Sequence, residues 1–376
     1  MRHVKRRPAG SLGRSLAAVV TVLAVATLCG ASSSDPGRTE VLGARLEAGP
    51  VPSSPADPSP PAADLGAPAP MNGASGGGSV AALPAELAPP GPDTGLVLVA
   101  PGVYTERETV DGRSRSWTVV VPQNRPAGKV PALVVLHGRG ATGEAMRAVG
   151  LDPLAAADGV VTVYPDAVDG SWNDGRPGME PLVAGSLVDD DAFLTRLLRR
   201  LTERAGVDPE RIAIAGFSNG ALMASRLACA HTDLFSAAVL VAGAGGADFA
   251  ERCAPARPLP VLVVGARRDP VVPYDGGAVA PAGNVRRGVV ASTADVVNRW
   301  AARNGCASRA ERAVNKEATE IDGVQCAGAP VVHYRLDLGV HEWRRSAAFD
   351  TTREAWGFVR EQWRARTGAP GSSTTA

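Results

Sequence analysis

The sequence predicts an α/β fold in which a mostly parallel sheet is covered by helices on both faces. Three observations lead to this prediction. Short apolar stretches alternate with longer amphipathic stretches through most of the chain. The region that carries them, residues 93–366, is long enough to form one core. Within it, a glycine-flanked serine, Ser218, separates an apolar stretch from a helix-like one.

The apolar stretches have the length and composition of buried strands. They are short, rich in Val and Ile, and apolar at most positions rather than at every second one. That pattern favours strands covered on both faces, as in a parallel sheet. The predicted strands are residues 117–121, 132–136, 159–164, 212–215, 236–241, 261–264 and 331–336.

Four stretches between or after these strands show helical periodicity. The clearest is 190–204, where five apolar side chains recur on one helical face. The last begins at a side chain that can cap a helix, Asp350 or Thr351. The predicted helices are residues 190–204, the stretch that follows Ser218 and ends at Ala230, and residues 293–303 and 350–364.

The N-terminal residues 1–31 predict an export signal. Basic side chains precede an apolar run at 16–28, and small residues at 29–31 offer a cleavage site before Ser32. The run is short for a membrane-spanning helix, so we expect cleavage, with a retained anchor as the alternative. We therefore expect a secreted or extracytoplasmic protein, including one associated with the cell envelope, whose mature form has no membrane span.

Two further segments have the composition of disordered chain. Residues 32–92 are mostly Pro, Ala, Gly and Ser, which cannot bury enough apolar surface to offset the entropy of ordering. We expect a disordered linker there and a disordered tail at 367–376. Lys and Arg together number 39 against 38 Asp and Glu, so the charge balance gives no indication of a nucleic-acid partner.

The strongest motif is the Gly-Phe-Ser-Asn-Gly sequence at residues 216–220. A strand, a sharp turn and a helix in that order expose a serine hydroxyl above the sheet, and flanking glycines allow the helix to pack closely behind the strand. The same spacing recurs at residues 73–77, but there no strand precedes it and no helix follows. Ser218 is therefore the candidate nucleophile.

A serine nucleophile needs a histidine as base and a carboxylate that orients the histidine. In this strand–turn–helix context the carboxylate follows the serine in the chain, and the histidine follows the carboxylate. Of five histidines, His3, His137 and His231 lie too early in the chain, and His333 lies inside a predicted strand. His341 follows that strand in a loop, where open α/β sheets carry their active sites, so it is the candidate base.

The candidate acid is Asp269, which stands just beyond the predicted strand 261–264, with Asp275 as the rival. A structural alternative for Asp269 is a local turn before Pro270. For the base, His333 is the second choice after His341. The oxyanion that forms during acyl transfer would be held by the backbone N–H of Asn219 and by an N–H from the loop after residue 136, which we place at Arg139.

A second glycine pattern supports a rival function. Gly138, Gly140 and Gly143 have the G-x-G-x-x-G spacing that binds dinucleotides, and Asp166 follows at the end of the next strand. This interpretation predicts an oxidoreductase, but an exported protein has little access to a nicotinamide cofactor, and Ser218, Asp269 and His341 would have no role.

Taken together, these residues resemble the polyhydroxybutyrate depolymerase, feruloyl esterase and acetylxylan esterase group of secreted α/β-hydrolases. The similar stretches are residues 136–140, 164–176, 188–194, 216–224, 269–274 and 339–343. The resemblance implies the α/β-hydrolase fold and the same triad of Ser218, Asp269 and His341. It also implies that the loop around Trp172 lines the acyl pocket, for which the alternative is a loop anchor. One departure lies after His341, where Trp-Pro-Gly is common in the group and Glu-Trp-Arg-Arg follows here.

Four cysteines remain beyond the export signal and allow three pairings. Cys229 and Cys253 flank one strand, and Cys306 and Cys326 bracket one loop, so we predict these two local disulfides. No C-x-x-C spacing supports a metal site.

The predicted function is an exported serine carboxylic-ester hydrolase that needs no cofactor or metal. Its partner would be an ester substrate, either oligomers of the polyhydroxybutyrate type or feruloyl or acetyl esters of polysaccharides. The alternatives are an acyltransferase on the same triad and a non-catalytic binding module of the same fold.

Overall fold

The computed structural model describes residues 100–180, 188–281 and 283–367. The predicted export signal (1–31), linker (32–92) and tail lie outside the described residues, apart from Thr367, which ends the last helix.

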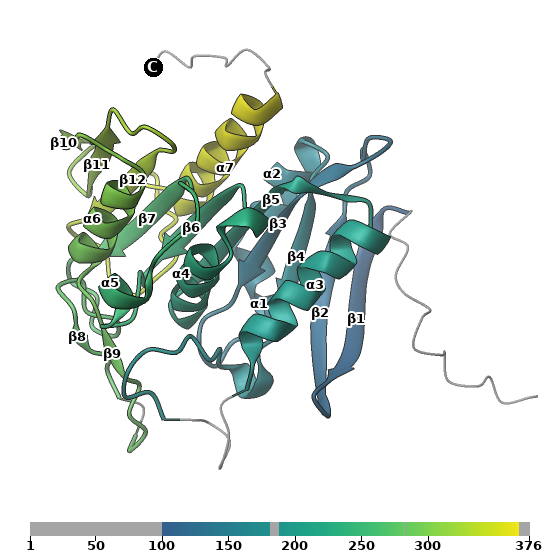
Figure 1. Cartoon of the computed structure of the whole chain (residues 1–376), viewed down its shortest axis with the longest axis horizontal. Coiled ribbons are helices and arrows are strands. Elements are labelled where there is room, and N and C mark those ends of the chain that lie inside the picture. Colours follow the sequence, from purple (N-terminus) through teal and green to yellow (C-terminus); the bar gives the residue numbers. More distant parts are fainter. Residues whose placement is uncertain (1–99, 181–187, 282, 368–376) are drawn as a thin grey trace, which may run out of the picture. The chain divides into compact units, whose positions relative to one another are not determined.

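Ten strands of the described chain form one sheet, which runs across the molecule in Figure 1. Six adjacent strands at its centre are parallel, and two strands at each edge are antiparallel. In spatial order the strands are β1 (Gly102–Val110), β2 (Arg113–Val121), β4 (Val161–Pro165), β3 (Val130–Leu136), β5 (Val207–Phe217), β6 (Ala237–Val241), β7 (Val261–Ala266), β12 (Val331–Leu336), β11 (Ala318–Val324) and β10 (Ser308–Ala313).

Helices pack on both faces of this sheet, as predicted. The described residues also form three short 3₁₀ turns, Arg147–Val149, Val168–Gly170 and Thr232–Leu234. A separate two-stranded ladder is formed by β8 (Gly277–Ala278) and β9 (Val289–Val290). The helices are α1 (Gly143–Met146), α2 (Leu151–Ala157), α3 (Asp190–Arg204), α4 (Asn219–Ala230), α5 (Phe249–Arg252), α6 (Thr293–Arg303) and α7 (Thr351–Thr367).

The two faces of the sheet belong to two buried clusters. In β3, Val134 and Leu136 pack in the cluster that contains the apolar faces of α3, α4 and α6. Leu133 and Val135 point the other way, into the cluster with α2 and α7. Buried strands that are apolar on both faces require this arrangement, so the α/β prediction is confirmed.

The edge strands β1, β10 and β11 were not predicted. Alternate residues of β1 are exposed, and β10 is exposed at nearly every position. Their sequences are accordingly rich in charged residues and lack the apolar runs that identified the central strands. The pairs β1–β2 and β10–β11 are held by local antiparallel ladders instead.

Candidate active site

Ser218 lies at the turn between β5 and α4. Its backbone has φ 56° and ψ −120°, a left-handed conformation that is strained for any residue except glycine. The strain is sustained because the turn is fixed on both sides by a buried strand and a buried helix. The turn holds the serine at the carboxyl end of a central strand.

The flanking glycines are required by close packing. A Cβ on Gly216 would lie 2.2 Å from the carbonyl oxygen of Gly220, and a Cβ on Gly220 would lie 2.4 Å from that of Leu136. Both contacts are with backbone atoms, which cannot move aside as a flexible side chain can. The sequence therefore makes the sharp turn possible by omitting both side chains.

The structure brings Ser218, His341 and Asp269 together, and we call this group the triad. His341 Nε2 lies 2.9 Å from Ser218 Oγ, and His341 Nδ1 lies 2.7 Å from Asp269 Oδ2. A carboxylate accepts, so Nδ1 carries the proton and Nε2 is free to accept the serine proton. The three residues follow the carboxyl ends of β5, β7 and β12.

Asp269 both forms a local turn and contacts His341. Its Oδ1 accepts hydrogen bonds from the backbone N–H groups of Val271 and Val272, at 2.8 and 2.9 Å, which is a local Asx turn. Its Oδ2 accepts from His341. The side chain is only 2 % exposed, so the turn fixes the carboxylate and buries it under the histidine.

The loop around His341 is held from two sides. The His341 ring packs against the Phe217 ring at 5.1 Å between centroids. The sequence that departs from the related esterases follows directly: Trp343 donates from Nε1 to Thr352 Oγ1 at 2.9 Å, and Arg344 forms ion pairs with Glu317 and Glu342. These contacts tie the histidine loop to α7 and to the loop before β11.

The other candidate bases are occupied elsewhere. His333 is fully buried and stacked on Tyr274, and burial lowers its pKa to about 3. His231 Nε2 lies within hydrogen-bond distance of Asp191 Oδ1, at 2.7 Å. The rival acid Asp275 is exposed and makes no contact with His341 in the described chain. His3 lies outside the described residues.

His137 is a positioning residue that the sequence did not identify. Its Nδ1–H donates to the Gly138 carbonyl at 2.8 Å, and its Nε2 accepts from the Ala167 N–H at 3.0 Å. One ring nitrogen donates and the other accepts, so the ring is neutral. Burial also favours the neutral ring, because it lowers the pKa of His137. The ring fixes the start of the loop that follows β3.

That loop contains the predicted oxyanion donor. Gly140 donates to the Gly170 carbonyl and Ala141 to the Gly138 carbonyl, whereas the Arg139 N–H has no acceptor within the described ranges. A Cβ on Gly138 would lie 3.3 Å from Ser218 Cβ, which places the loop against the serine. Asn219 begins α4, so its N–H has no partner within the helix.

Trp172 is buried, and both its side chain and its backbone hydrogen-bond to neighbouring segments. Its side chain is 0 % exposed, and Nε1 donates to the His137 carbonyl at 2.9 Å. Its backbone N–H and C=O bond the side-chain amide of Asn219, at 2.8 and 3.0 Å. These contacts fit the loop-anchor alternative, and a place for Trp172 in the acyl pocket stays a prediction.

The Asn219 amide also reaches a buried ion pair. Its Nδ2 donates to Asp174 Oδ2 at 2.7 Å, and the same oxygen accepts from Arg176 Nη1 at 2.6 Å. Burial raises the pKa of Asp174 and lowers the pKa of Arg176, while their mutual attraction opposes both shifts. The residue after the nucleophile is thus fixed by a charged network.

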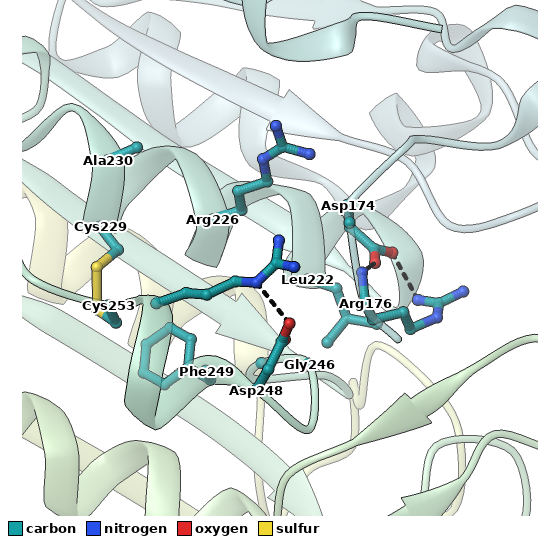
Figure 2. Close-up of a pocket in the computed structure, with 13 residues that line it drawn as sticks. Asp174, Arg176, Leu222, Arg226, Cys229, Ala230, Gly246, Asp248, Phe249 and Cys253 are labelled. Atoms are coloured by element: carbon teal, nitrogen blue, oxygen red, sulfur yellow. Dashed lines mark hydrogen bonds and ion pairs between the residues drawn. A yellow bond between two sulfur atoms is a disulfide. The ribbon is translucent and has the colours of Figure 1, made fainter. Parts of the chain in front are cut away.

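A pocket of about 200 Å³ lies beside this network along α4. Figure 2 shows the Asp174–Arg176 pair at one end of the pocket and a disulfide at the other. None of the triad residues lines it. It is therefore a neighbour of the triad and not the space in which the serine would meet a substrate.

The cysteines form the pairs expected from the sequence. Cys229 is bonded to Cys253 and Cys306 to Cys326. The first links the end of α4 to the segment after α5, and the second closes the base of the β10–β11 hairpin. Within the described residues no group of side chains is arranged to hold a metal ion, and no helix there is long and apolar enough to span a bilayer.

The glycines at residues 138–143 allow a loop to pack closely against a strand. Gly143 begins the four-residue helix α1, and a Cβ there would lie 2.3 Å from the Tyr164 carbonyl oxygen. Asp166, the acid that would bind a ribose, accepts from the Gly143 N–H at 2.7 Å and from Ser116 Oγ at 2.8 Å. The pattern packs the loop after β3 against β4.

The arrangement of the triad suits nucleophilic attack on an acyl carbon. A buried carboxylate orients the imidazole, the imidazole accepts the serine proton, and the serine stands at the start of a helix whose N–H groups favour negative charge. Thioester, ester and amide carbonyls are all attacked in this way, so the geometry alone defines a reaction type and not a substrate.

Comparison with known proteins narrows the reaction type. The model of the Prolyl oligopeptidase family matches residues 194–251, which include Ser218 and α4. The chain is 34 % identical over 263 residues, or 65 % of its own length and 75 % of the relative's, to "Putative esterase NocK" from Nocardia uniformis subsp. tsuyamanensis.

Two further relatives match over shorter segments. "Feruloyl esterase B" from Piromyces equi is 32 % identical over 40 % of this chain and 28 % of its own length. "Poly(3-hydroxyalkanoate) depolymerase C" from Paucimonas lemoignei is 28 % identical over 33 % of this chain and 30 % of its own length. The chain therefore spans less than a third of each of these two relatives.

Proposed function

Because the chain belongs to the esterases of the α/β-hydrolase group, we propose that it is an exported serine esterase that hydrolyses carboxylic esters through Ser218, His341 and Asp269. The observation that carries the proposal is the continuous hydrogen-bonded chain from Ser218 Oγ through the His341 ring to Asp269 Oδ2. The chain order of the three residues and their proximity both support the proposal.

The reaction has two halves. His341 Nε2 takes the Ser218 proton as Oγ attacks the ester carbonyl carbon, and the new imidazolium stays paired with the Asp269 carboxylate. The imidazolium then gives that proton to the leaving alcohol as the ester C–O bond breaks, which leaves an acyl-serine. Water attacks the acyl-serine with His341 again as base, and the acid is released with the serine restored.

The oxyanion in each half would be held by the backbone N–H groups of Asn219 and Arg139. Asn219 is supported by its place at the first turn of α4. Arg139 is supported by an N–H that has no acceptor among the described residues and by the close approach of its loop to Ser218. Loss of one such donor in other serine hydrolases slows turnover by about 10²- to 10³-fold.

The substrate class rests on the named relatives. A feruloyl esterase and a poly(3-hydroxyalkanoate) depolymerase are both similar to this chain. We propose that the substrate is either a feruloyl or acetyl ester of a polysaccharide or an oligomer of a 3-hydroxyalkanoate. Both present an ester of a small acyl group within a larger chain.

Export is supported by the two disulfides, since such bonds persist in oxidising compartments and are rare in the cytosol. Non-reducing peptide mapping of the protein as isolated from its host should recover the pairs 229–253 and 306–326. Four free thiols would count against export.

The function is tested by initial rates of the full chain beside its Ser218→Ala variant. The substrates are p-nitrophenyl acetate, methyl ferulate, acetylated xylan and a 3-hydroxybutyrate oligomer. Methanol is added as an acyl acceptor to all of them except methyl ferulate, for which ethanol is used because methanol would only regenerate the substrate. The proposal expects hydrolysis of at least one ester and its loss in the variant. Equal rates in both proteins would contradict it, and methyl- or ethyl-ester formation in preference to acid would favour an acyltransferase.

A further inference from the structure

The N–H at the start of α4 belongs to a peptide that follows a strained residue. It is the N–H of Asn219, and the residue before it, Ser218, has φ 56° and ψ −120°. Rotation of the peptide between them would relieve the strain and change the direction of the N–H. A donor that stabilises an oxyanion has to be aimed at it before the reaction begins, so this peptide has to be fixed.

Contacts on both sides fix this peptide. The Ser218 carbonyl oxygen accepts from the Leu222 N–H at 3.1 Å, within the first turn of α4. The Asn219 amide accepts at Oδ1 from the Trp172 N–H at 2.8 Å, and its Nδ2 donates to the Trp172 carbonyl at 3.0 Å and to Asp174 Oδ2 at 2.7 Å. Few torsion angles separate this amide from the Asn219 Cα, so holding the amide also holds the backbone N–H.

Among the bonds to the Asn219 amide, the one to Asp174 has a charged acceptor. A hydrogen bond to a carboxylate is stronger than one between neutral amides, such as those to Trp172. The carboxylate is itself fixed, because its Oδ1 accepts from the Arg176 N–H at 3.0 Å and its side chain is only 1 % exposed. Asp174 is therefore the rigid end of the contacts that lead to the Asn219 N–H.

Arg176 neutralises this carboxylate. A buried negative charge near the nucleophile would repel a developing oxyanion unless a cation balanced it. Arg176 Nη1 bonds to Asp174 Oδ2 at 2.6 Å, as Figure 2 shows, and Arg176 Nε donates to the Arg287 carbonyl at 2.5 Å. Gly246 leaves room for the arginine, since a Cβ there would lie 3.0 Å from Arg176 Cβ. The pair thus supplies a fixed acceptor with little net charge.

We propose that Asp174 is a positioning residue for the oxyanion hole and acts through the side-chain amide of Asn219. The proposal rests on the function proposed above. Without the carboxylate the amide keeps only its neutral bonds, the peptide after the nucleophile gains freedom, and the oxyanion loses the alignment of one donor. Proton transfer by His341 is unaffected, because neither His341 nor Asp269 forms a hydrogen bond with Asp174 in the described part of the chain.

Asp190 offers a matched control. Its carboxylate is also buried, pairs with Arg115 at 2.6 Å, and supports the loop that contains Asp174 by accepting from the Asn173 N–H at 2.7 Å. It forms no hydrogen bond with Asn219 among the described residues. Asp190→Asn therefore disturbs the same loop and a similar ion pair without touching the amide. If Asp174 did no more than anchor the loop, the two variants would behave alike.

The first experiment measures hydrolysis of p-nitrophenyl acetate by the full chain, Asp174→Asn and Asp190→Asn at a temperature where all three are folded. Active sites are counted by complete reaction with a fluorophosphonate, so that unfolded protein does not enter the rates. The kcat/KM per active site should fall about tenfold in Asp174→Asn, less than on loss of a whole donor because the N–H remains. It should change by less than about threefold in Asp190→Asn.

A pair of ketone inhibitors gives a readout that a loss of stability does not move. The trifluoromethyl ketone 1,1,1-trifluoro-4-phenylbutan-2-one adds the serine hydroxyl and forms an oxyanion, whereas 4-phenylbutan-2-one resembles only the ground state. In Asp174→Asn the inhibition constant of the trifluoromethyl ketone should rise about tenfold, in step with the fall in kcat/KM. That of the methyl ketone should stay within about twofold.

Asn219→Ala tests the route of the effect. This variant keeps the backbone N–H and the pair of Asp174 with Arg176 but removes the amide. It should lower kcat/KM about tenfold by itself, and adding Asp174→Asn should lower it little further, because both changes remove the same contact. Since it leaves the ion pair intact, it also tests the proposal if Asp174→Asn does not fold.

Three results would overturn the proposal: parental kcat/KM and inhibition constants in Asp174→Asn, an equal loss in Asp190→Asn, or losses that multiply when Asp174→Asn and Asn219→Ala are combined. Each differs from failure of the proposed function. Absence of ester hydrolysis in the parent chain would reject the esterase, whereas normal hydrolysis by the parent with any of these results would reject only the role of Asp174.

Discussion

Ser218 Oγ and His341 Nε2 lie 2.9 Å apart although 123 residues separate them in the chain. The contact depends on the sheet, because β5 and β12 end at the same edge with β6 and β7 between them. Parallel strands place their following loops together, and so a turn and a distant loop meet above one edge. The predictions below test what this contact and its surroundings do.

Asp269→Asn should lower kcat by about 10⁴-fold with little change in KM, because an amide cannot stabilise the imidazolium and favours the wrong tautomer. Ester hydrolysis at neutral pH measures the effect. The control is Asp275→Asn, which removes a carboxylate from an exposed position in the same loop. If both variants lost activity equally, the assignment of the acid to Asp269 would be wrong.

Trp172→Phe should reduce stability and leave acyl-chain preference unchanged. The variant loses the hydrogen bond from the indole to the buried His137 carbonyl, which should cost about 1–3 kcal/mol of unfolding free energy. Denaturant unfolding measures the first effect, and the ratio of rates on acetyl and butyryl esters measures the second. An altered ratio with intact stability would return Trp172 to the acyl pocket.

Gly216→Ala should destabilise the fold by at least about 1–3 kcal/mol, because its Cβ would collide with the Gly220 carbonyl. Gly357→Ala is the matched control: it lies in α7, where a Cβ would meet nothing within 4 Å. That variant should gain about 0.5–1 kcal/mol from helix propensity. Thermal or urea unfolding distinguishes the two, and equal effects would contradict the close packing at the turn.

Unfolding free energy should decrease in acid partly because of His333. Burial lowers its pKa from 6.5 to about 3, so the unfolded chain binds more protons than the folded chain between these values. The stabilisation is therefore present above pH 6.5 and is lost as the pH falls toward 3, at up to about 1.4 kcal/mol per pH unit.

His333→Gln carries no titrating group at this position and should show a shallower decline of unfolding free energy over the same pH range. The slopes are compared, so the lower absolute stability expected of the variant does not affect the result. Identical slopes would mean that His333 titrates alike in the folded and unfolded chains.

The sequence predicted the parts of the fold whose physical origin is local. The sequence patterns correctly predicted the ends of helices α3, α4 and α6 and of strand β12. Amphipathic periodicity and continuous apolar runs can be recognised from consecutive residues alone. The sharp turn at residues 216–220 was predictable for the same reason. Strands β1 and β10 were not, since exposed ladders depend on their neighbours and leave little hydrophobic pattern.

In the candidate site, too, some residues could be predicted from local sequence and others could not. Ser218, Asp269 and His341 follow strand ends and could be selected by chain order. The roles of Asp174 and Arg176 had only a weak signal, within the stretch that resembles the related esterases. Trp172 was predictable as a loop residue, but its complete burial was not.

The most direct measurement is the mass of the full chain after treatment with a fluorophosphonate, followed by peptide mapping. The account predicts a single adduct on Ser218, formed in parallel with loss of ester hydrolysis, and no adduct on Ser218→Ala. An adduct on another residue, or full esterase activity without any adduct, would contradict the assignment of Ser218 as the nucleophile.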